Sequence, residues 1–139
     1  MPKTEQEIRQ IELDVADAFN QGDIDRILSF FDQDLAGFSS TRHERLHGLE
    51  AMRNTFSYYL ERSESMEFAL DQVEVHQYGE TAVSTFYWSI FMKTASGEHE
   101  ITGRGSHVFV RRNGDWKIVH EHFSRAQHPP ELWDTSPGE

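Results

Sequence analysis

The sequence predicts an α+β domain in which N-terminal helices pack on one face of a strongly curved antiparallel sheet. In the first half of the chain, hydrophobic residues recur at the spacing of amphipathic helices, whereas from Met66 onward they alternate with polar residues as in strands. Short turn sequences separate the strand-like stretches, and the clearest of them, Asn113-Gly114, strongly favours a β-hairpin. Helices followed by hairpin-linked strands are typical of an α+β fold.

Three helices are expected. The first begins at the capping box Thr4-Glu5-Gln6-Glu7, because a threonine followed three residues later by a glutamate can satisfy the free N–H groups of a helix start. Gly22 ends this helix, Asp23 caps a short second helix, and a third helix is expected over 49–62. The apolar face of the first helix consists of Ile8, Ile11, Val15, Ala18 and Phe19.

Four long strands are expected in the second half of the chain. They cover residues 66–78, 81–94, 98–111 and 116–124, and they are preceded by a short strand or extended loop at 35–40 and a polar loop at 41–47. The stretch 81–94 is rich in the β-branched and aromatic residues that strands favour. Because the last three strands are long, the sheet should twist and curve into a cone around the helices, with a cavity at its open end.

Composition and charge restrict the class of protein. The chain has 139 residues, 37% hydrophobic and 27% charged, as expected of one globular domain; we assign residues 1–126 to this domain and 127–139, with three prolines, to a C-terminal tail. The net charge of −11 argues against nucleic acids and anionic membranes as partners, since both need a basic surface. The first residues have no apolar segment of the kind found in signal peptides, no run is long enough to span a membrane, and there is no cysteine, so we expect a soluble cytoplasmic protein.

The last predicted strand ends in His120-Glu121-His122, three ionisable residues after an apolar run. Alternation along a strand puts both imidazoles on one face and Glu121 on the other. Two histidines could share a metal ion, but no acidic ligand follows them, and a metal site needs a complete ligand set. The favoured interpretation is that His120 and His122 are packed, hydrogen-bonded structural residues, and neither a metal nor another cofactor is predicted.

Four segments mark the turns and the last hairpin of the chain: Asn20-Gln21-Gly22-Asp23, Gly48, Gly79-Glu80 and Val108–Ser124. With these segments, the order of the elements resembles the SnoaL-like branch of the nuclear transport factor 2-like superfamily. The resemblance spans about Glu5 to Ala126 and is nearest to the association (hub) domain of calcium/calmodulin-dependent kinase II and its stand-alone bacterial relatives. It implies a cone-shaped, cystatin-like barrel that forms a homodimer through the exposed face of its sheet.

The resemblance also implies a deep pocket inside the cone that takes a small-molecule ligand. Where the hub domains carry arginines that can hold a small carboxylate, this chain has Trp88, His107 and Phe123, and Met52 stands near the position of a helix histidine. The implied pocket is therefore more apolar and aromatic than that of the hub domains. Its predicted ligand-binding residues are Met52, Phe56, Tyr59, Trp88, His107 and Phe123.

Glu121 and His107 are the predicted catalytic residues. By alignment with the family, the face of the strand that carries Glu121 points into the cavity, where a carboxyl group among aromatic side chains is suited to general acid–base catalysis with His107 across the sheet. Two alternatives remain open. Glu121 pairs with Arg104 or Arg111, or a β-bulge turns it toward the outer surface of the dimer.

Two functions are consistent with these features. The favoured one is a small-molecule-binding or oligomerisation domain without catalysis, because the catalytic signatures of the fold are missing; ketosteroid isomerases, for example, place a general-base aspartate about where this chain has Gly37-Phe38-Ser39. The alternative is a small isomerase, dehydratase or cyclase that uses Glu121 and His107 on a neutral organic substrate. This alternative requires a pocket of at least ~300 Å³ that both residues face.

Overall fold

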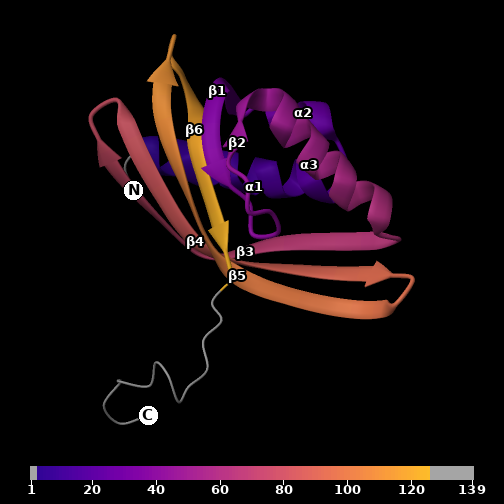
Figure 1. The fold of residues 1–139 in the computed structure, drawn as a ribbon. Helices are drawn as coiled ribbons and strands as arrows, with labels where there is room; N and C mark the ends of the chain where they lie inside the picture. The colour runs from indigo at the N-terminus through magenta and orange to yellow at the C-terminus, as the bar shows by residue number, and fades with distance from the viewer. Residues whose placement is uncertain (1–2, 126–139) are drawn as a thin grey trace, which may run out of the picture.

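Residues 3–125 are described by a computed structural model of the chain (Figure 1). The predicted tail, 127–139, lies outside the described residues. The helices are α1 (Lys3–Asn20), α2 (Ile24–Leu28) and α3 (Gly48–Arg62). The strands are β1 (Phe31–Phe38), β2 (Leu46–His47), β3 (Ser65–Tyr78), β4 (Thr81–Thr94), β5 (Gly97–Arg112) and β6 (Asp115–Ser124).

The strands form one curved sheet in the order β2-β1-β6-β5-β4-β3. Strands β3, β4 and β5 bend along their length, and the three helices lie on the concave side of the sheet (Figure 1). The predicted fold class is confirmed. The sheet is mixed, however, because β1 runs parallel to β6 while every other neighbouring pair is antiparallel. It does not close, since β2 and β3 remain as its two edges.

The local signals for helices and strands hold with small changes of boundary. Asp23 caps α2, and its side chain accepts a hydrogen bond from the backbone N–H of Arg26 at 3.1 Å. Thr4 already lies within α1, so the predicted N-cap is misplaced. The chain is extended from Phe31 onward, so β1 begins earlier than the predicted strand or loop at 35–40.

One strand lies where the sequence predicted only a polar loop. Strand β2 consists of Leu46 and His47, which pair with Gly37 and Ala36 of β1. Leu46 is an isolated apolar residue in a polar segment and gives no periodic signal. Its side chain is buried in the core, and this burial draws the segment against β1.

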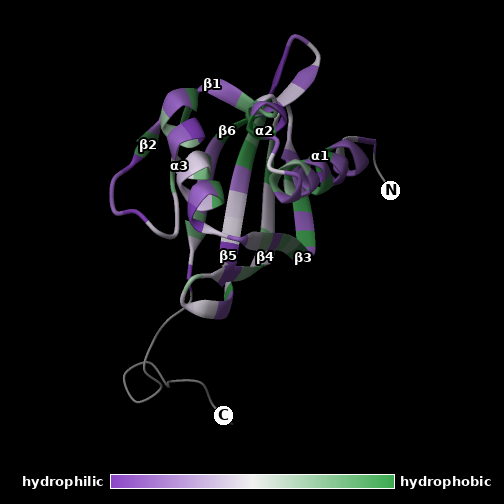
Figure 2. Cartoon of the chain, turned by 90° about the vertical axis from the view of Figure 1, so that its right-hand side faces the viewer, coloured by the Kyte–Doolittle hydropathy of each residue, from purple (hydrophilic) through white to green (hydrophobic). Residues whose placement is uncertain are grey.

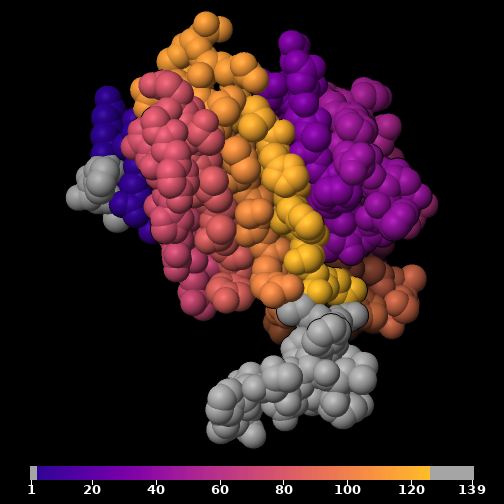
Figure 3. All heavy atoms as spheres, turned by 60° about the vertical axis from the view of Figure 1, so that its left-hand side comes forward, coloured from indigo at the N-terminus to yellow at the C-terminus, as the bar shows by residue number. Residues whose placement is uncertain are grey.

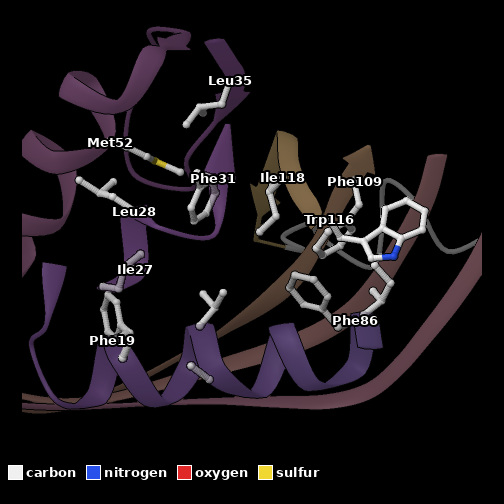
Figure 4. Packing of buried hydrophobic residues seen from close by; sticks show 14 of the residues in the cluster. Phe19, Ile27, Leu28, Phe31, Leu35, Met52, Phe86, Phe109, Trp116 and Ile118 are labelled. Atoms are coloured by element: carbon white, nitrogen blue, oxygen red, sulfur yellow. The ribbon is translucent and has the colours of Figure 1, made fainter. Parts of the chain in front are cut away.

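The hydrophobic core fills the space between the helices and the concave face of the sheet. Hydrophobic and hydrophilic segments alternate along the strands (Figure 2), as expected when one face is covered and the other is open. Side chains from all three helices meet those from β1 and from β4 to β6 (Figure 4). None of the helices in residues 3–125 combines the length and hydrophobicity that crossing a membrane requires.

Candidate functional site

A cavity of ≈ 100 Å³ lies between α1, α3 and the concave face of the sheet. Its walls are largely apolar, with aromatic side chains from α1, α3, β3, β4 and β6. Its volume falls short of the ~300 Å³ required for the enzymatic alternative, because side chains fill most of the space that the curved sheet encloses. All six predicted ligand-binding residues line the cavity: Met52, Phe56, Tyr59, Trp88, His107 and Phe123.

At one end of the cavity, His107 lies between two glutamates and forms a buried Glu12–His107–Glu121 cluster. The Nδ1 atom of His107 is 2.9 and 2.8 Å from the two carboxylate oxygens of Glu12, and its Nε2 atom is 2.8 Å from Oε1 of Glu121. The exposed fractions of Glu12, His107 and Glu121 are 1%, 2% and 7%. Glu121 therefore pairs with His107 and not with Arg104 or Arg111. The alternative in which it pairs with one of these arginines is wrong.

The facing of Glu121 depends on a β-bulge in β6. Trp116 and Ile118 point into the core, so simple alternation would bring His120 inward next. In the pairing of β5 with β6, Val108 is opposite His120 and Phe109 is opposite Ile118, which leaves Val119 without a partner. The extra residue shifts the alternation by one position, and Glu121 faces the cavity in place of His120. The β-bulge considered in the sequence analysis does occur, but it turns Glu121 toward the cavity and not toward the outer surface.

Glu12 was not identified from the sequence, although a signal was present. It lies four residues after Ile8 and three before Val15, which places a carboxylate on the apolar face of α1. A charged side chain on a buried helix face needs a partner, because an unpaired buried charge is costly. Arg125, just beyond the end of β6, also lines the cavity and was likewise missed.

The charges of the cluster keep His107 protonated. Burial lowers the pKa of its imidazolium, but the charges and hydrogen bonds of Glu12 and Glu121 outweigh this effect and raise the pKa from 6.5 to about 10. As an imidazolium, His107 donates from Nδ1 to Glu12 and from Nε2 to Glu121. Its ring also packs against Phe31, Phe86, Phe109 and Phe123 at centroid distances of 5.2–6.0 Å, which restricts its orientation.

Trp88 and Phe123 form the aromatic wall beside this cluster. Their rings stack with centroids 5.7 Å apart, and the indole Nε1 of Trp88 donates to the carbonyl oxygen of Arg104 at 2.9 Å. The indole passes over Gly103, where an added Cβ would lie 2.5 Å from the ring. Gly103, the residue before Arg104, therefore makes room for the indole.

His120 and His122 lie apart from the cavity lining. Nδ1 of His120 donates to the carbonyl oxygen of Ala36 at 2.9 Å, which links β6 to β1. The exposed ring of His122 packs on Phe38 with a centroid distance of 5.3 Å. His120 thus has the structural role predicted for it. His122 packs on Phe38 but is exposed, and its side chain makes no hydrogen bond within residues 3–125, so the prediction of a hydrogen-bonded residue is wrong for His122. Within residues 3–125, no group of three or more acidic, histidine or cysteine side chains is arranged to hold a metal ion.

A tight backbone contact supports the position of Glu121. Gly37 of β1 is the register partner of Glu121, and a Cβ added to it would lie 2.3 Å from the Glu121 carbonyl oxygen. We expect Gly37→Ala to lower the free energy of unfolding by roughly 1–3 kcal/mol, because the added methyl group must push the two strands apart. Chemical denaturation measures this, with Gln33→Ala, an exposed change in the same strand, as the control. An unchanged Gly37→Ala midpoint would contradict the close approach.

A family model described as SnoaL-like domain matches residues 8–128 of the chain. No curated protein matches the chain in sequence.

Several solved structures share the fold at low sequence identity. A nuclear transport factor 2-like protein of unknown function from Pseudomonas putida superposes with a TM-score of 0.81 at 24% identity, covering 93% of this chain and 90% of that one. A proposed dehydratase from Streptomyces avermitilis gives 0.80 at 18% identity, covering 90% and 97%. The association domain of calcium/calmodulin-dependent kinase II from C. elegans gives 0.71 at 20% identity, covering 86% and 93%. At such identities the likeness concerns the fold alone.

Proposed function

The chain belongs to the SnoaL-like domain family, and from this premise we propose that it binds a small organic molecule in its internal cavity. The observation that supports this proposal most is that apolar walls and a few convergent polar groups, the Glu12–His107–Glu121 cluster, line the same internal cavity. Binding pockets commonly have this composition, in which apolar surface supplies affinity and a few polar groups supply orientation.

Filling the cavity should abolish binding. Leu70 lines the cavity from β3 and is half-buried, so Leu70→Trp can place an indole in the space without disturbing the centre of the core. We expect wild-type protein to bind neutral organic fragments in ligand-observed NMR, and Leu70→Trp to lose this binding while it stays folded. Glu67→Trp, on the exposed side of the same strand, is the matched control. Equal fragment binding by both variants would refute binding in the cavity.

A second candidate function, acid–base catalysis on the bound molecule, is supported by the geometry of Glu121; because the cavity of ≈ 100 Å³ is smaller than a whole substrate requires, only the reacting end of the molecule would lie inside it. One carboxylate oxygen of Glu121 is held by His107, and the residue lines the cavity. Glu121 can accept a proton from a carbon or oxygen of the ligand while the hydrogen bond from His107 holds its carboxyl group in place. It can then return that proton to another atom of the ligand. A proton removed and returned at different atoms gives isomerisation; a proton returned to a leaving hydroxyl group gives dehydration.

Glu121→Gln tests this second candidate, because it keeps the shape of the side chain and removes the base. With a ligand found in the fragment screen that carries an acidic C–H bond, we expect wild-type protein in D₂O to catalyse deuterium incorporation, detected by mass spectrometry. The variant should be slower by roughly 10²–10⁴-fold. Binding without catalysed exchange in the wild type would leave a binding domain.

We further propose that the domain forms a homodimer through the convex face of its sheet. Strands β4, β5 and β6 lie side by side on this face (Figure 3), and β4 exposes Tyr87 and Phe91 there, each 52% accessible. Large apolar side chains exposed on one face of a sheet favour association. One of the structural neighbours is itself an association domain.

Light scattering tests the dimer directly. We expect the wild type at micromolar concentration to have twice the mass of the 16.2 kDa chain, and the double variant Tyr87→Glu/Phe91→Glu to be monomeric, since two buried negative charges oppose the contact. Tyr58→Glu, an equally exposed aromatic residue on α3, should leave the mass unchanged. A wild-type monomer would contradict the proposal.

A further inference from the structure

A second hollow adjoins the mouth of the cavity, and we infer that it binds the anionic group of an amphipathic organic acid whose apolar part enters the cavity. This hollow, here called the outer groove, has a volume of ≈ 640 Å³. It lies between α3, the segment at Thr41-Arg42 and the adjoining ends of β3 and β4. The inference rests on the proposed binding function and adds the chemical class of the ligand.

The first argument is size. An apolar cavity of about 150 Å³ is what a benzene molecule needs, so the inner cavity of ≈ 100 Å³ holds a group smaller than a phenyl ring. Binding sites for small organic molecules usually measure about 300–1,000 Å³. A ligand of ordinary size must therefore extend beyond the inner cavity, and the outer groove supplies the missing volume.

The second argument is continuity. Five residues line both spaces, namely Thr41, Thr55, Tyr59, Met66 and Met92. The hydroxyl groups of Thr41 and Tyr59 are hydrogen-bonded to each other and thus stand at the junction between the two spaces. Methionine side chains are flexible and adapt to the shape of a chain that passes between them.

The third argument is charge. The outer groove is lined by Arg42 and Arg62 and by no acidic residue, although the chain as a whole carries a net charge of −11. The guanidinium of Arg62 stacks on the ring of Tyr58 at 3.8 Å, and no carboxylate in the described part of the chain lies within 4.0 Å of its nitrogens. A stacked guanidinium is held in place with its N–H groups free to pair with a carboxylate.

Arg42 is also available to a ligand. Its nearest acidic neighbour, Glu44, is 4.0 Å away and largely exposed, and its contact with the hydroxyl group of Thr55 is long at 3.5 Å. An exposed ion pair of this length contributes little and exchanges readily for a better partner.

The inner end of the cavity determines the direction in which such a ligand binds. This end presents two carboxyl groups, those of Glu12 and Glu121, on either side of His107, while Arg125 lines the cavity as well. The two carboxyl groups disfavour an anion and accept hydrogen bonds from a neutral polar group. The anionic group of the ligand therefore lies toward the two arginines, and the opposite end of its apolar part approaches Glu121.

Octanoate, 1-octanol and octylamine, which share one chain length and differ in charge, serve as the probes. Calorimetric titration of the full chain should give octanoate an affinity at least roughly tenfold above that of octanol, with octylamine no better than octanol. Octanoate affinity should decrease as salt is added, while octanol affinity should not. Equal affinities for octanoate and octanol, or tighter binding of octylamine, overturn the inference.

Charge-removing variants locate the anion. In Arg42→Gln/Arg62→Gln, octanoate should bind roughly tenfold more weakly or worse, and octanol should bind as it does to the wild type. Arg53→Gln on α3 is the matched control, because Arg53 pairs with Asp25 and does not line the groove. Octanoate binding that survives the double variant overturns the inference.

The two proposals fail in distinguishable ways. If octanol binds and Leu70→Trp removes that binding, while octanoate binds no better than octanol, the cavity binds ligands and the arginines do not select an anion. If none of the three probes and no neutral fragment binds, both proposals are refuted. Thermal unfolding of each variant shows that the protein tested is folded. Arg42 and Arg62 are exposed and Arg53 is half-buried, and none of the three belongs to the hydrophobic core.

Discussion

Replacing Glu12 alone by methionine is expected to lower the free energy of unfolding by roughly 3–5 kcal/mol. The substitution keeps the length of the side chain but removes the charge that faces Nδ1 of His107 at 2.8 Å. A buried imidazolium that loses one of its two carboxylates keeps the cost of its own desolvation. Urea denaturation at pH 7, followed by tryptophan fluorescence, measures the loss.

Glu50→Met is the control for this experiment, because Glu50 lies on the exposed side of α3 and such changes usually alter stability by no more than about 0.5 kcal/mol. The triple variant Glu12→Met/His107→Leu/Glu121→Leu provides a second comparison. Replacing a whole buried charged set by apolar residues is often neutral or stabilising, so the triple variant should be more stable than Glu12→Met. If it is less stable, or if Glu12→Met behaves as Glu50→Met does, the cluster is not the coupled unit described above.

The stability of the protein should decrease as the pH rises from neutrality toward about 10. In the folded state, Glu12 and Glu121 raise the pKa of His107 from 6.5 to about 10, despite the opposing effect of burial. A proton that is bound more tightly in the folded than in the unfolded chain stabilises folding. This contribution is fully present below pH 6.5 and is lost as the pH rises through the folded-state pKa.

Denaturation at half-unit intervals from pH 6 to pH 10.5 tests this expectation. The slope over this range should largely disappear in the triple variant, which has no His107, and should remain in His76→Gln, which removes an exposed histidine beside Glu74. Other groups also titrate above pH 9 and contribute to the slope in both proteins. The difference in slope between the wild type and the triple variant therefore isolates the contribution of the cluster. Equal slopes in the wild type and the triple variant would show that His107 does not take up the extra proton on folding.

The architecture could be predicted well because its signals are local. The limits of β4 were predicted to the residue, since alternation and turn residues mark both ends. The parallel pairing of β1 with β6 has no such signal, because the two strands are far apart in sequence and meet only when the core forms. Strand β2 depends on the burial of Leu46, and a two-residue strand gives no alternation of apolar and polar residues from which it could be predicted.

The site was predicted in part for the same reason. The family resemblance brought His107, Glu121 and the aromatic wall to one cavity, and the structure places all of them there. Glu12 is hard to distinguish in the sequence because α1 is rich in acidic residues, and the others are all at least partly exposed. The cavity volume could not be predicted, because it is set by how side chains fill the cone.

The position of His107 between Glu12 and Glu121 bears on how the chain folds. The hydrogen-bonded pair Glu12 and His107 is separated by 95 residues, and β6, which supplies Glu121, is the last strand of the sheet along the chain. Contacts so distant in sequence close a long loop and slow folding. During synthesis, Glu12 is made long before His107 and Glu121, and its side chain stays hydrated until they are present. The acid–base cluster thus becomes complete only when the sheet does, so a molecule that binds to it recognises the finished fold and none of its precursors.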